Sequence, residues 1–193
     1  QALKALLIQQ NVTLLEQTQL EPLQQTTFID GWRTSTGETL EADAFVVTSG
    51  AWSFELLKDT SAGLNIKPMR GQILLYQAPQ NPLKHIVYNN GFYLVPRRDG
   101  YLLAGSTLED VGFDPRTTEE VKIELQAKAE VIMPNLKHAP IIKHWSGLRP
   151  GTPDNLPTIA VHPTIQNLNT GHFRYGLTMA PASAARIAKL VYA

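Results

Sequence analysis

Two short turn signals in the middle of the chain constrain its fold more than any other feature. Asn89-Asn90-Gly91 and Arg98-Asp99-Gly100 consist of residues that tolerate a positive φ, as tight hairpin turns require. Strands joined by turns this short run antiparallel. We therefore predict an antiparallel meander for the middle of the chain, built from segments with strand character at residues 71–76, 86–89, 91–96 and 101–105.

The N-terminal part alternates helical and strand patterns. Residues 2–10 place leucines at helical spacing and indicate the end of an amphipathic helix, and residues 12–15 follow as a short strand. A small hairpin is predicted over residues 28–40. The unbroken apolar run at 44–48 is typical of a strand that is covered on both faces. A helix that leads into a strand is common in α/β units.

The C-terminal part contains the clearest helix. Thr117 and Glu120 have the spacing of a capping box, and Pro134 is expected to end the helix. Pro181 is predicted to open a final helix over residues 182–192. Between the two helices we expect a strand, a loop rich in Gly and Pro, and two short strands, at residues 141–146, 147–157, 158–161 and 168–170.

Together these elements indicate an α+β fold with two lobes. Residues 1–62 and 146–193 are expected to form an α/β lobe from both ends of the chain. Residues 63–145 are expected to form an antiparallel-sheet lobe with one helix. The length of 193 residues suits one domain or two small ones.

Composition excludes several kinds of partner and site. The chain has 17 basic and 17 acidic residues, so it offers no basic stripe for nucleic acid. It contains no cysteine, which excludes disulfides and thiolate sites and fits a cytoplasmic location. The histidines show no metal-ligand spacing, and no apolar run approaches the roughly 20 residues of a membrane span. We therefore expect no nucleic acid, no membrane and no metal.

Arg149 is the first candidate for chemistry in a chain that has no dinucleotide fingerprint, P-loop, H-E-x-x-H or G-x-S-x-G motif. It lies in Gly147-Leu148-Arg149-Pro150-Gly151, where the proline favours an extended backbone at Arg149. Such a loop would hold a guanidinium, the natural bidentate partner of a carboxylate. The alternative is a surface turn with a solvated arginine, since arginine is mostly exposed.

Two further segments combine glycine with aromatic and donor side chains. Residues 170–177 place two aromatic rings and two potential donors between glycines, which allow the backbone to approach a ligand closely. The alternative is a glycine-rich connection whose aromatic rings pack in the core. In residues 91–97, Tyr93 can offer a hydroxyl to a carboxylate, and the alternative is a half-buried structural tyrosine.

Taken in order, segments 93–100, 103–107, 147–152, 171–174 and 180–182 resemble the D-amino-acid oxidase-like family of FAD-dependent oxidoreductases. Within that family they resemble the bacterial glycine oxidase branch of thiamine biosynthesis. Lys67-Pro68-Met69-Arg70-Gly71-Gln72 also matches the start of the family's substrate domain, and Ser49-Gly50-Ala51-Trp52-Ser53 matches the loop that approaches the flavin nucleotide. The match covers nearly the whole chain.

The resemblance implies FAD as the cofactor, with a small amino acid and oxygen as substrates. Arg149 matches the arginine that grips the substrate carboxylate, Tyr93 matches the tyrosine that supports it, and Arg174 matches an arginine beside the active site. The residues that match flavin contacts are Leu20 near the adenine, then Gly50, Ala51 and Trp52, and along the isoalloxazine edge Gly171, His172, Phe173, Gly176 and Leu177.

The resemblance also implies that the α/β lobe is a partial FAD-binding lobe, because the family's dinucleotide fingerprint would lie upstream of Gln1. The expected function is the C-terminal part of an oxidase that converts glycine or another small amino acid to the imine and releases hydrogen peroxide. Tyr175 stands where glycine oxidases usually have asparagine, and Gly91 and Leu108 also depart from some relatives. Open alternatives are sarcosine or another secondary amine as substrate, the oxidase half of a tRNA-modifying enzyme, and a catalytically silent module. A homo-oligomer also stays open.

Overall fold

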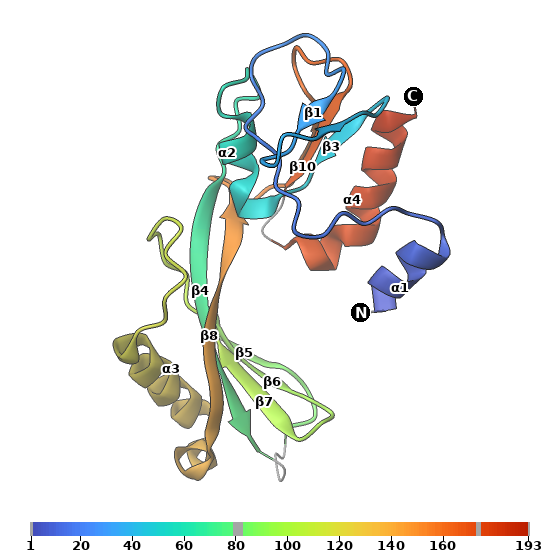
Figure 1. The fold of residues 1–193 in the computed structure, drawn as a ribbon. Helices are drawn as coiled ribbons and strands as arrows, with labels where there is room; N and C mark the ends of the chain where they lie inside the picture. Colours follow the sequence, from blue (N-terminus) through green and yellow to red (C-terminus); the bar gives the residue numbers. More distant parts are fainter. Residues whose placement is uncertain (1, 79–82, 173–174, 193) are drawn as a thin grey trace.

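The computed structural model describes residues 2–78, 83–172 and 175–192. They form two lobes, and a pair of long strands connects these lobes (Figure 1). The two strands are β4 (Lys67–Gln77) and β8 (Ile141–Gly151), which pair antiparallel along their length. Both lobes are therefore built on one continuous strand pair.

The larger sheet has the strand order β5-β6-β7-β4-β8, and every pairing in it is antiparallel. Its shorter strands are β5 (Val87–Asn89), β6 (Phe92–Pro96) and β7 (Tyr101–Gly105). The turns between them carry the positive φ that their sequences indicate, 84° at Gly91 and 81° at Gly100. The predicted meander is thus confirmed.

Helix α3 (Glu119–Ile132) packs against this sheet, and the short 3-10 helix η2 (Pro134–His138) follows it (Figure 1). The N-cap of α3 is Thr118, one residue beyond the predicted Thr117. Thr118 Oγ1 accepts a hydrogen bond from the N–H of Val121 at 3.4 Å. The apolar face of the helix and one face of the sheet share a buried core, which includes Leu74, Leu94, Leu102, Ala104, Leu125 and Ala129.

The second lobe contains a three-stranded sheet in which β10 (Leu168–His172) is central. It runs parallel to β3 (Phe45–Val47) and antiparallel to β9 (Thr158–Val161). Its core includes Trp32, Val47, Leu57, Ile165 and Leu168. The fold is therefore α+β, as predicted. The other elements of this lobe are α1 (Ala2–Gln9), β1 (Trp32–Arg33), β2 (Thr39–Leu40), η1 (Gly50–Trp52), α2 (Ser53–Leu57) and α4 (Gly176–Val191).

Near the N-terminus one predicted strand is not formed, and one predicted hairpin is much shorter than expected. Residues 12–15 form no strand. Val12 and Leu15 are exposed, and among the described residues no neighbouring strand pairs with this segment. The hairpin predicted over 28–40 reduces to β1 and β2, which are two residues each. Apolar side chains alone do not make a strand, because the backbone also needs a hydrogen-bonding neighbour.

Two predictions near the C-terminus also need correction. The segment 147–151, predicted as part of a loop, continues β8, because β4 supplies it with partners such as Met69 opposite Arg149. Helix α4 begins at Gly176 rather than at Ala182, so Pro181 lies inside the helix. The helix forgoes the bond that the missing N–H of Pro181 would make, a loss confined to its second turn.

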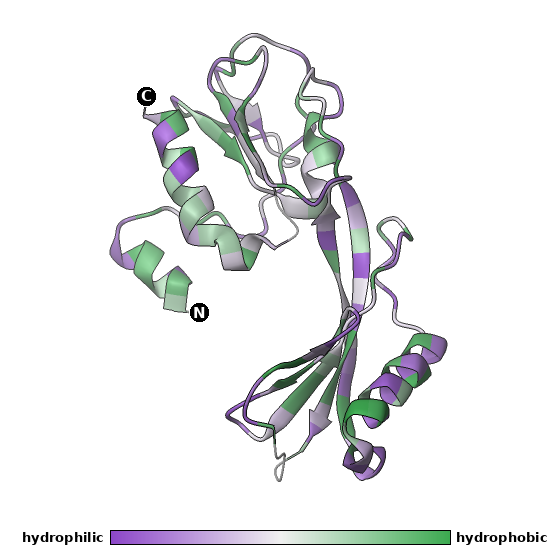
Figure 2. Cartoon of the chain, turned by 180° about the vertical axis from the view of Figure 1, so that it is seen from behind, coloured by the Kyte–Doolittle hydropathy of each residue, from purple (hydrophilic) through white to green (hydrophobic). Residues whose placement is uncertain are grey.

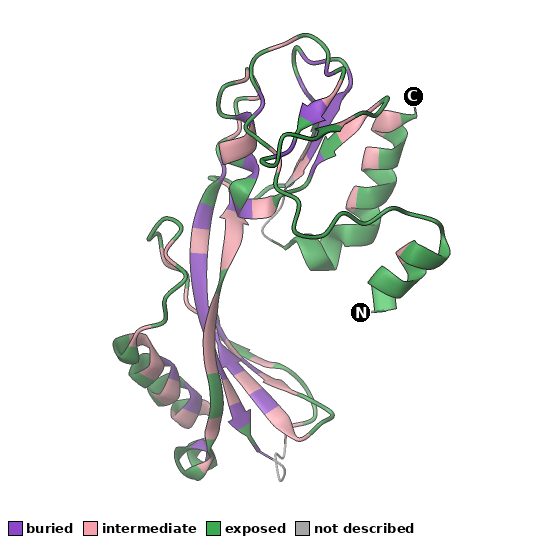
Figure 3. Ribbon diagram, in the orientation of Figure 1, coloured by how far each residue is buried: buried purple, intermediate pink, exposed green. Residues whose placement is uncertain are grey.

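Two helices of the second lobe leave much apolar surface uncovered. Colouring by hydropathy shows α1 and most of α4 as apolar (Figure 2), and colouring by burial shows the same segments mainly as exposed (Figure 3). Leu3 and Leu177 are examples of large apolar side chains in contact with solvent. No helix in the described part of the chain has the length and apolar character needed to cross a membrane.

Candidate functional site

The strand register places Tyr93 and Arg149 on the same face of the larger sheet. Tyr93 on β6 lies opposite Gly105, which lies opposite Ile73 on β4, while Arg149 on β8 lies opposite Met69. Ile73 and Met69 are an even number of residues apart on β4, so their side chains share a face. Both Tyr93 and Arg149 line one polar cavity of about 690 Å³. Two residues that the sequence singled out separately are therefore brought to one site.

The Arg149 guanidinium is held by protein oxygens, and no acidic side chain in the described part of the chain pairs with it. Nη1 donates a hydrogen bond to the carbonyl oxygen of Thr107 at 3.2 Å, and Nη2 donates to Oγ of Ser106 at 2.8 Å. Within the described ranges no Asp or Glu forms an ion pair with Arg149. Its charge is therefore free to pair with an anionic ligand, and a guanidinium has further N–H groups for a bidentate contact.

A partly buried ion pair supports the segment that holds Arg149. Nη2 and Nε of Arg70 lie 2.6 Å and 3.2 Å from Oε2 of Glu109, and the Arg70 side chain is only 6% exposed. Nε2 of Gln72 donates to both carboxylate oxygens of Glu109, at 3.1 Å and 3.2 Å, and Thr107 Oγ1 donates to Oε1. Burial acts to raise the pKa of Glu109, but the hydrogen bonds from Arg70, Thr107 and Gln72 outweigh it and lower that pKa. Glu109 therefore stays ionised at neutral pH.

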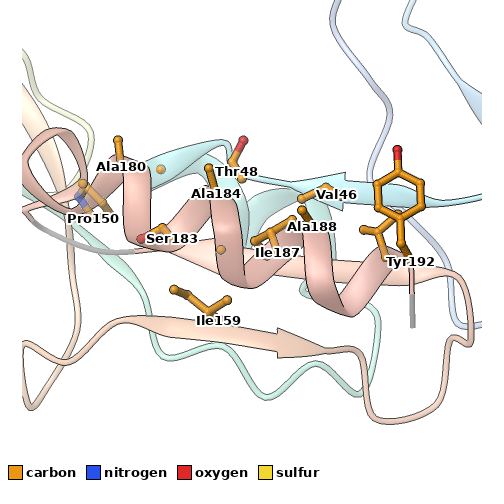
Figure 4. A pocket seen from close by; sticks show the side chains of 14 residues that line it. Val46, Thr48, Pro150, Ile159, Ala180, Ser183, Ala184, Ile187, Ala188 and Tyr192 are labelled. Atoms are coloured by element: carbon orange, nitrogen blue, oxygen red, sulfur yellow. The ribbon is translucent and has the colours of Figure 1, made fainter.

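A second cavity, of about 670 Å³, lies between α4 and the three-stranded sheet (Figure 4). Its walls are mainly apolar, and the figure shows side chains of α4 such as Ala184 and Ile187 facing it across from Thr48 and Ile159. Gly50, Gly171 and Gly176 also line it. Three of the glycines predicted to approach the flavin, although they lie on η1, β10 and α4, thus line the same cavity.

The other predicted flavin contacts lie elsewhere or fall outside the described residues. Ala51 is buried, whereas Trp52 is half exposed, with its ring centroid 5.8 Å from that of Phe113. Leu20 forms a bridge with Thr34 and packs against the core of the second lobe. Leu177 projects into solvent, and His172 pairs through its backbone with Thr158. Phe173 lies outside the described residues, as does Arg174, which was predicted beside the active site rather than at the flavin.

Four residues of the polar site were missed by the reasoning from sequence. Gly71 faces the guanidinium of Arg149, and Ser106, Thr107 and Glu109 hold or border it. The only available signal was that Gly71, Ser106 and Thr107 lie in segments that match the family, which gave them no individual role. In the described part of the chain no group of three or more His, Asp or Glu side chains could hold a metal ion.

Comparison with known proteins agrees with this geometry. The model of the FAD dependent oxidoreductase family matches residues 1–190. Glycine oxidase of Pseudomonas aeruginosa is 41% identical over 184 residues, which are 94% of this chain and 50% of that protein. The bifunctional protein ThiO/ThiG of Trichormus variabilis is 38% identical over 174 residues, which are 88% of this chain and 26% of that protein.

A solved structure is similar over the same range. The crystal structure of glycine oxidase from Geobacillus kaustophilus matches with a TM-score of 0.86 and 30% identity, covering 93% of this chain and 49% of that one. The chain spans about half the length of the glycine oxidases that it matches. Sequence, fold and family match agree, and the chain belongs to the family of FAD dependent oxidoreductases.

Proposed function

We propose that the chain supplies the carboxylate-binding site and one wall of the flavin site of an oxidase that acts on glycine or another small amino acid. The products are the imine and hydrogen peroxide, and the pathway served is thiamine biosynthesis. The names of the relatives, glycine oxidase and ThiO/ThiG, support this assignment. The observation that carries it is the guanidinium of Arg149, which has no acidic partner in the described ranges and lines the same cavity as Tyr93.

The residues of the polar cavity account for binding and orientation of the substrate. Arg149 binds the carboxylate through two N–H groups, and the hydroxyl of Tyr93 donates a further hydrogen bond to it. These contacts fix the α-carbon so that its hydrogen points toward the cofactor. Bound FAD would supply the acceptor for the hydride that leaves the α-carbon while the amino group loses a proton to give the imine, and oxygen would take up the two electrons and two protons as hydrogen peroxide. On the basis of the family resemblance, we also propose Arg174 as a residue beside this site.

The open glycine backbone of the apolar cavity supports its assignment to one side of the flavin. A side-chain carbon at Gly50 or Gly176 would meet no atom within 4 Å, so the backbone at both positions is open to a ligand. Gly50 also has a φ of 59°, which favours glycine. We therefore propose residues 1–62 and 146–193 as a partial FAD-binding lobe and 63–145 as the substrate lobe. The flavin contacts proposed for Leu20, Ala51, Trp52, His172, Phe173 and Leu177 rest on the family resemblance, and the lack of cysteine supports a cytoplasmic location.

The test is the steady-state kinetics of the flavin-loaded protein that carries this chain. Removing one partner of a desolvated charge pair costs about 3–5 kcal/mol. Arg149→Ala should therefore raise KM for the amino acid by about 100-fold or more. Arg97→Ala is the matched control, because Arg97 is exposed and pairs with Asp99. Unchanged kinetics in Arg149→Ala would refute the proposal, and a preparation without a flavin absorbance band would favour the silent module.

The polar cavity also supports a second candidate, the oxidation of a secondary amine such as sarcosine. Its volume of about 690 Å³ is larger than glycine needs, and Tyr88, Glu124 and Lys128 line it in addition to the carboxylate-binding residues. A substituent on the amino group would find space and polar partners there. Peroxide release measured with glycine, D-alanine and sarcosine separates the candidates through their values of kcat/KM.

A further inference from the structure

The guanidinium of Arg149 occupies the space in which any other residue at position 71 would place its side chain. A side-chain carbon built on Gly71 would overlap Nη1 of Arg149 and lie 2.5 Å from Cζ and 2.6 Å from Nη2. Gly71 lies on β4 two residues beyond Met69, the register partner of Arg149, so the arginine reaches diagonally across the sheet face. The absence of a side chain at Gly71 lets the guanidinium lie against the backbone of β4.

Ser106 and Thr107 close a second side of this position. Oγ of Ser106 and the carbonyl oxygen of Thr107 accept hydrogen bonds from Nη2 and Nη1, at 2.8 Å and 3.2 Å. With Gly71 they form what we call the guanidinium seat. The seat therefore consists of β4 on one side and the segment after β7 on the other.

Contacts with β4 fix the segment that carries Ser106 and Thr107. The N–H of Gln72 donates to Thr107 Oγ1 at 2.8 Å, and the N–H of Thr107 donates to the carbonyl oxygen of Gln72 at 3.3 Å. Arg70 and Glu109 exchange two backbone hydrogen bonds, at 2.8 Å and 2.9 Å, in addition to their side-chain ion pair. Arg70 and Gln72 flank Gly71 in the sequence. Three consecutive residues of β4 therefore both contact the guanidinium, through Gly71, and fix the segment of Ser106 and Thr107, through Arg70 and Gln72.

We propose that Gly71 is a positioning residue, and that it sets where the Arg149 guanidinium meets a small carboxylate. A flexible arginine would have to be ordered when the ligand binds, whereas the seat orders it beforehand and so spares that cost. The carboxylate as ligand rests on the proposed function, but the seat itself does not. A methyl group at position 71 would push the guanidinium away from both oxygens without disturbing the ladder, since the guanidinium is the far end of a flexible side chain.

Gly147 provides a matched control for a substitution at Gly71. The two glycines lie directly opposite each other on β8 and β4, and neither has a positive φ. A side-chain carbon at Gly147 would meet no atom within 4 Å. Gly71→Ala and Gly147→Ala therefore make the same change in the same ladder, and only the first one meets Arg149.

The experiment uses two readouts on the flavin-loaded protein that carries this chain. The first is the Nε–Hε NMR signal of Arg149 without ligand, and the second is the dissociation constant of acetate from a chemical-shift titration. We expect Gly71→Ala to shift the Arg149 signal and to weaken acetate binding by at least about tenfold, which corresponds to 1.4 kcal/mol. Gly147→Ala should leave both unchanged. Similar thermal midpoints for the two variants would show that both are folded.

The two readouts separate the failure of this inference from the failure of the proposed function. An unchanged Arg149 signal in Gly71→Ala, or an equal change in Gly147→Ala, would overturn the seat. Acetate that does not bind the unsubstituted flavin-loaded protein would instead overturn the carboxylate site, and with it the role of the seat in binding. A shifted Arg149 signal together with weakened acetate binding in Gly71→Ala alone would support both.

Discussion

Nη2 of Arg149 donates a 2.8 Å hydrogen bond to Oγ of Ser106, although β4 lies between the segments that carry the two residues. Arg149 is on β8, and Ser106 directly follows β7. The contact therefore crosses the central strand of the polar site. It makes the position of the guanidinium depend on three neighbouring strands rather than on its own strand alone.

Substitution of Ser106 by alanine should weaken substrate binding without removing it. A hydrogen bond to a charged group contributes about 1.5–3 kcal/mol, and the bond to the carbonyl oxygen of Thr107 remains. We expect KM of the flavin-loaded protein to rise by about tenfold or more, with a smaller change in kcat. Ser61→Ala in the other lobe is the control. A KM equal to that of the unsubstituted protein would show that the Ser106 contact has no part in binding.

The ion pair between Arg70 and Glu109 should matter more for stability than any exposed pair in the chain. Replacement of Glu109 by alanine removes the nearer carboxylate of Arg70 and leaves only Asp114, whose Oδ2 lies 3.4 Å from Nη1, so we expect a cost of up to about 3 kcal/mol. We expect this loss in the free energy of unfolding measured with urea at neutral pH. The pair between Glu55 and Lys58 is exposed, so Glu55→Ala should cost less than about 1 kcal/mol. Equal losses in the two variants would contradict the prediction.

How much of the fold could be read from sequence depends on whether the signal is local. The turns at Asn90-Gly91 and Asp99-Gly100 are local, since each needs only residues that tolerate positive φ, and the meander follows from them. The continuation of β8 through Arg149 and Pro150 is not local. Proline and glycine argue against a strand there, and only the long partner β4 makes it one.

The candidate site shows the same division. Arg149 and Tyr93 could be named because both types of side chain bind carboxylates and both lie in family motifs. Gly71 could not be assigned a role, because its importance comes from a guanidinium that reaches over it from another strand. Such contacts are set by register and by side-chain direction, which residue spacing within one segment does not contain.

His162 should make stability depend on pH in the slightly acidic range. Its side chain is buried, Nδ1 accepts hydrogen bonds from the N–H groups of Thr164 and Ile165 at 3.2 Å and 3.0 Å, and Nε2 lies 3.1 Å from Oγ1 of Thr60. Burial lowers the pKa of His162. A proton on Nδ1 would also remove the acceptor of the two backbone bonds. The folded protein therefore favours the neutral form of this histidine at neutral pH.

The sign of the effect follows from the lowered pKa. In the unfolded chain His162 titrates near its ordinary pKa of about 6.5, so below that pH the unfolded state binds more protons than the folded state. The contribution of His162 to the free energy of unfolding should be complete above about pH 6.5. Below that pH it should fall, by up to about 1.4 kcal/mol per pH unit, until the folded pKa is reached.

His162→Asn keeps an acceptor but does not titrate. Urea denaturation between about pH 7.5 and about pH 5 should therefore show that its free energy of unfolding depends less steeply on pH. His85→Asn, at an exposed position, should keep the slope of the unsubstituted chain. Equal slopes in His162→Asn and the unsubstituted chain would assign the acid sensitivity to other groups.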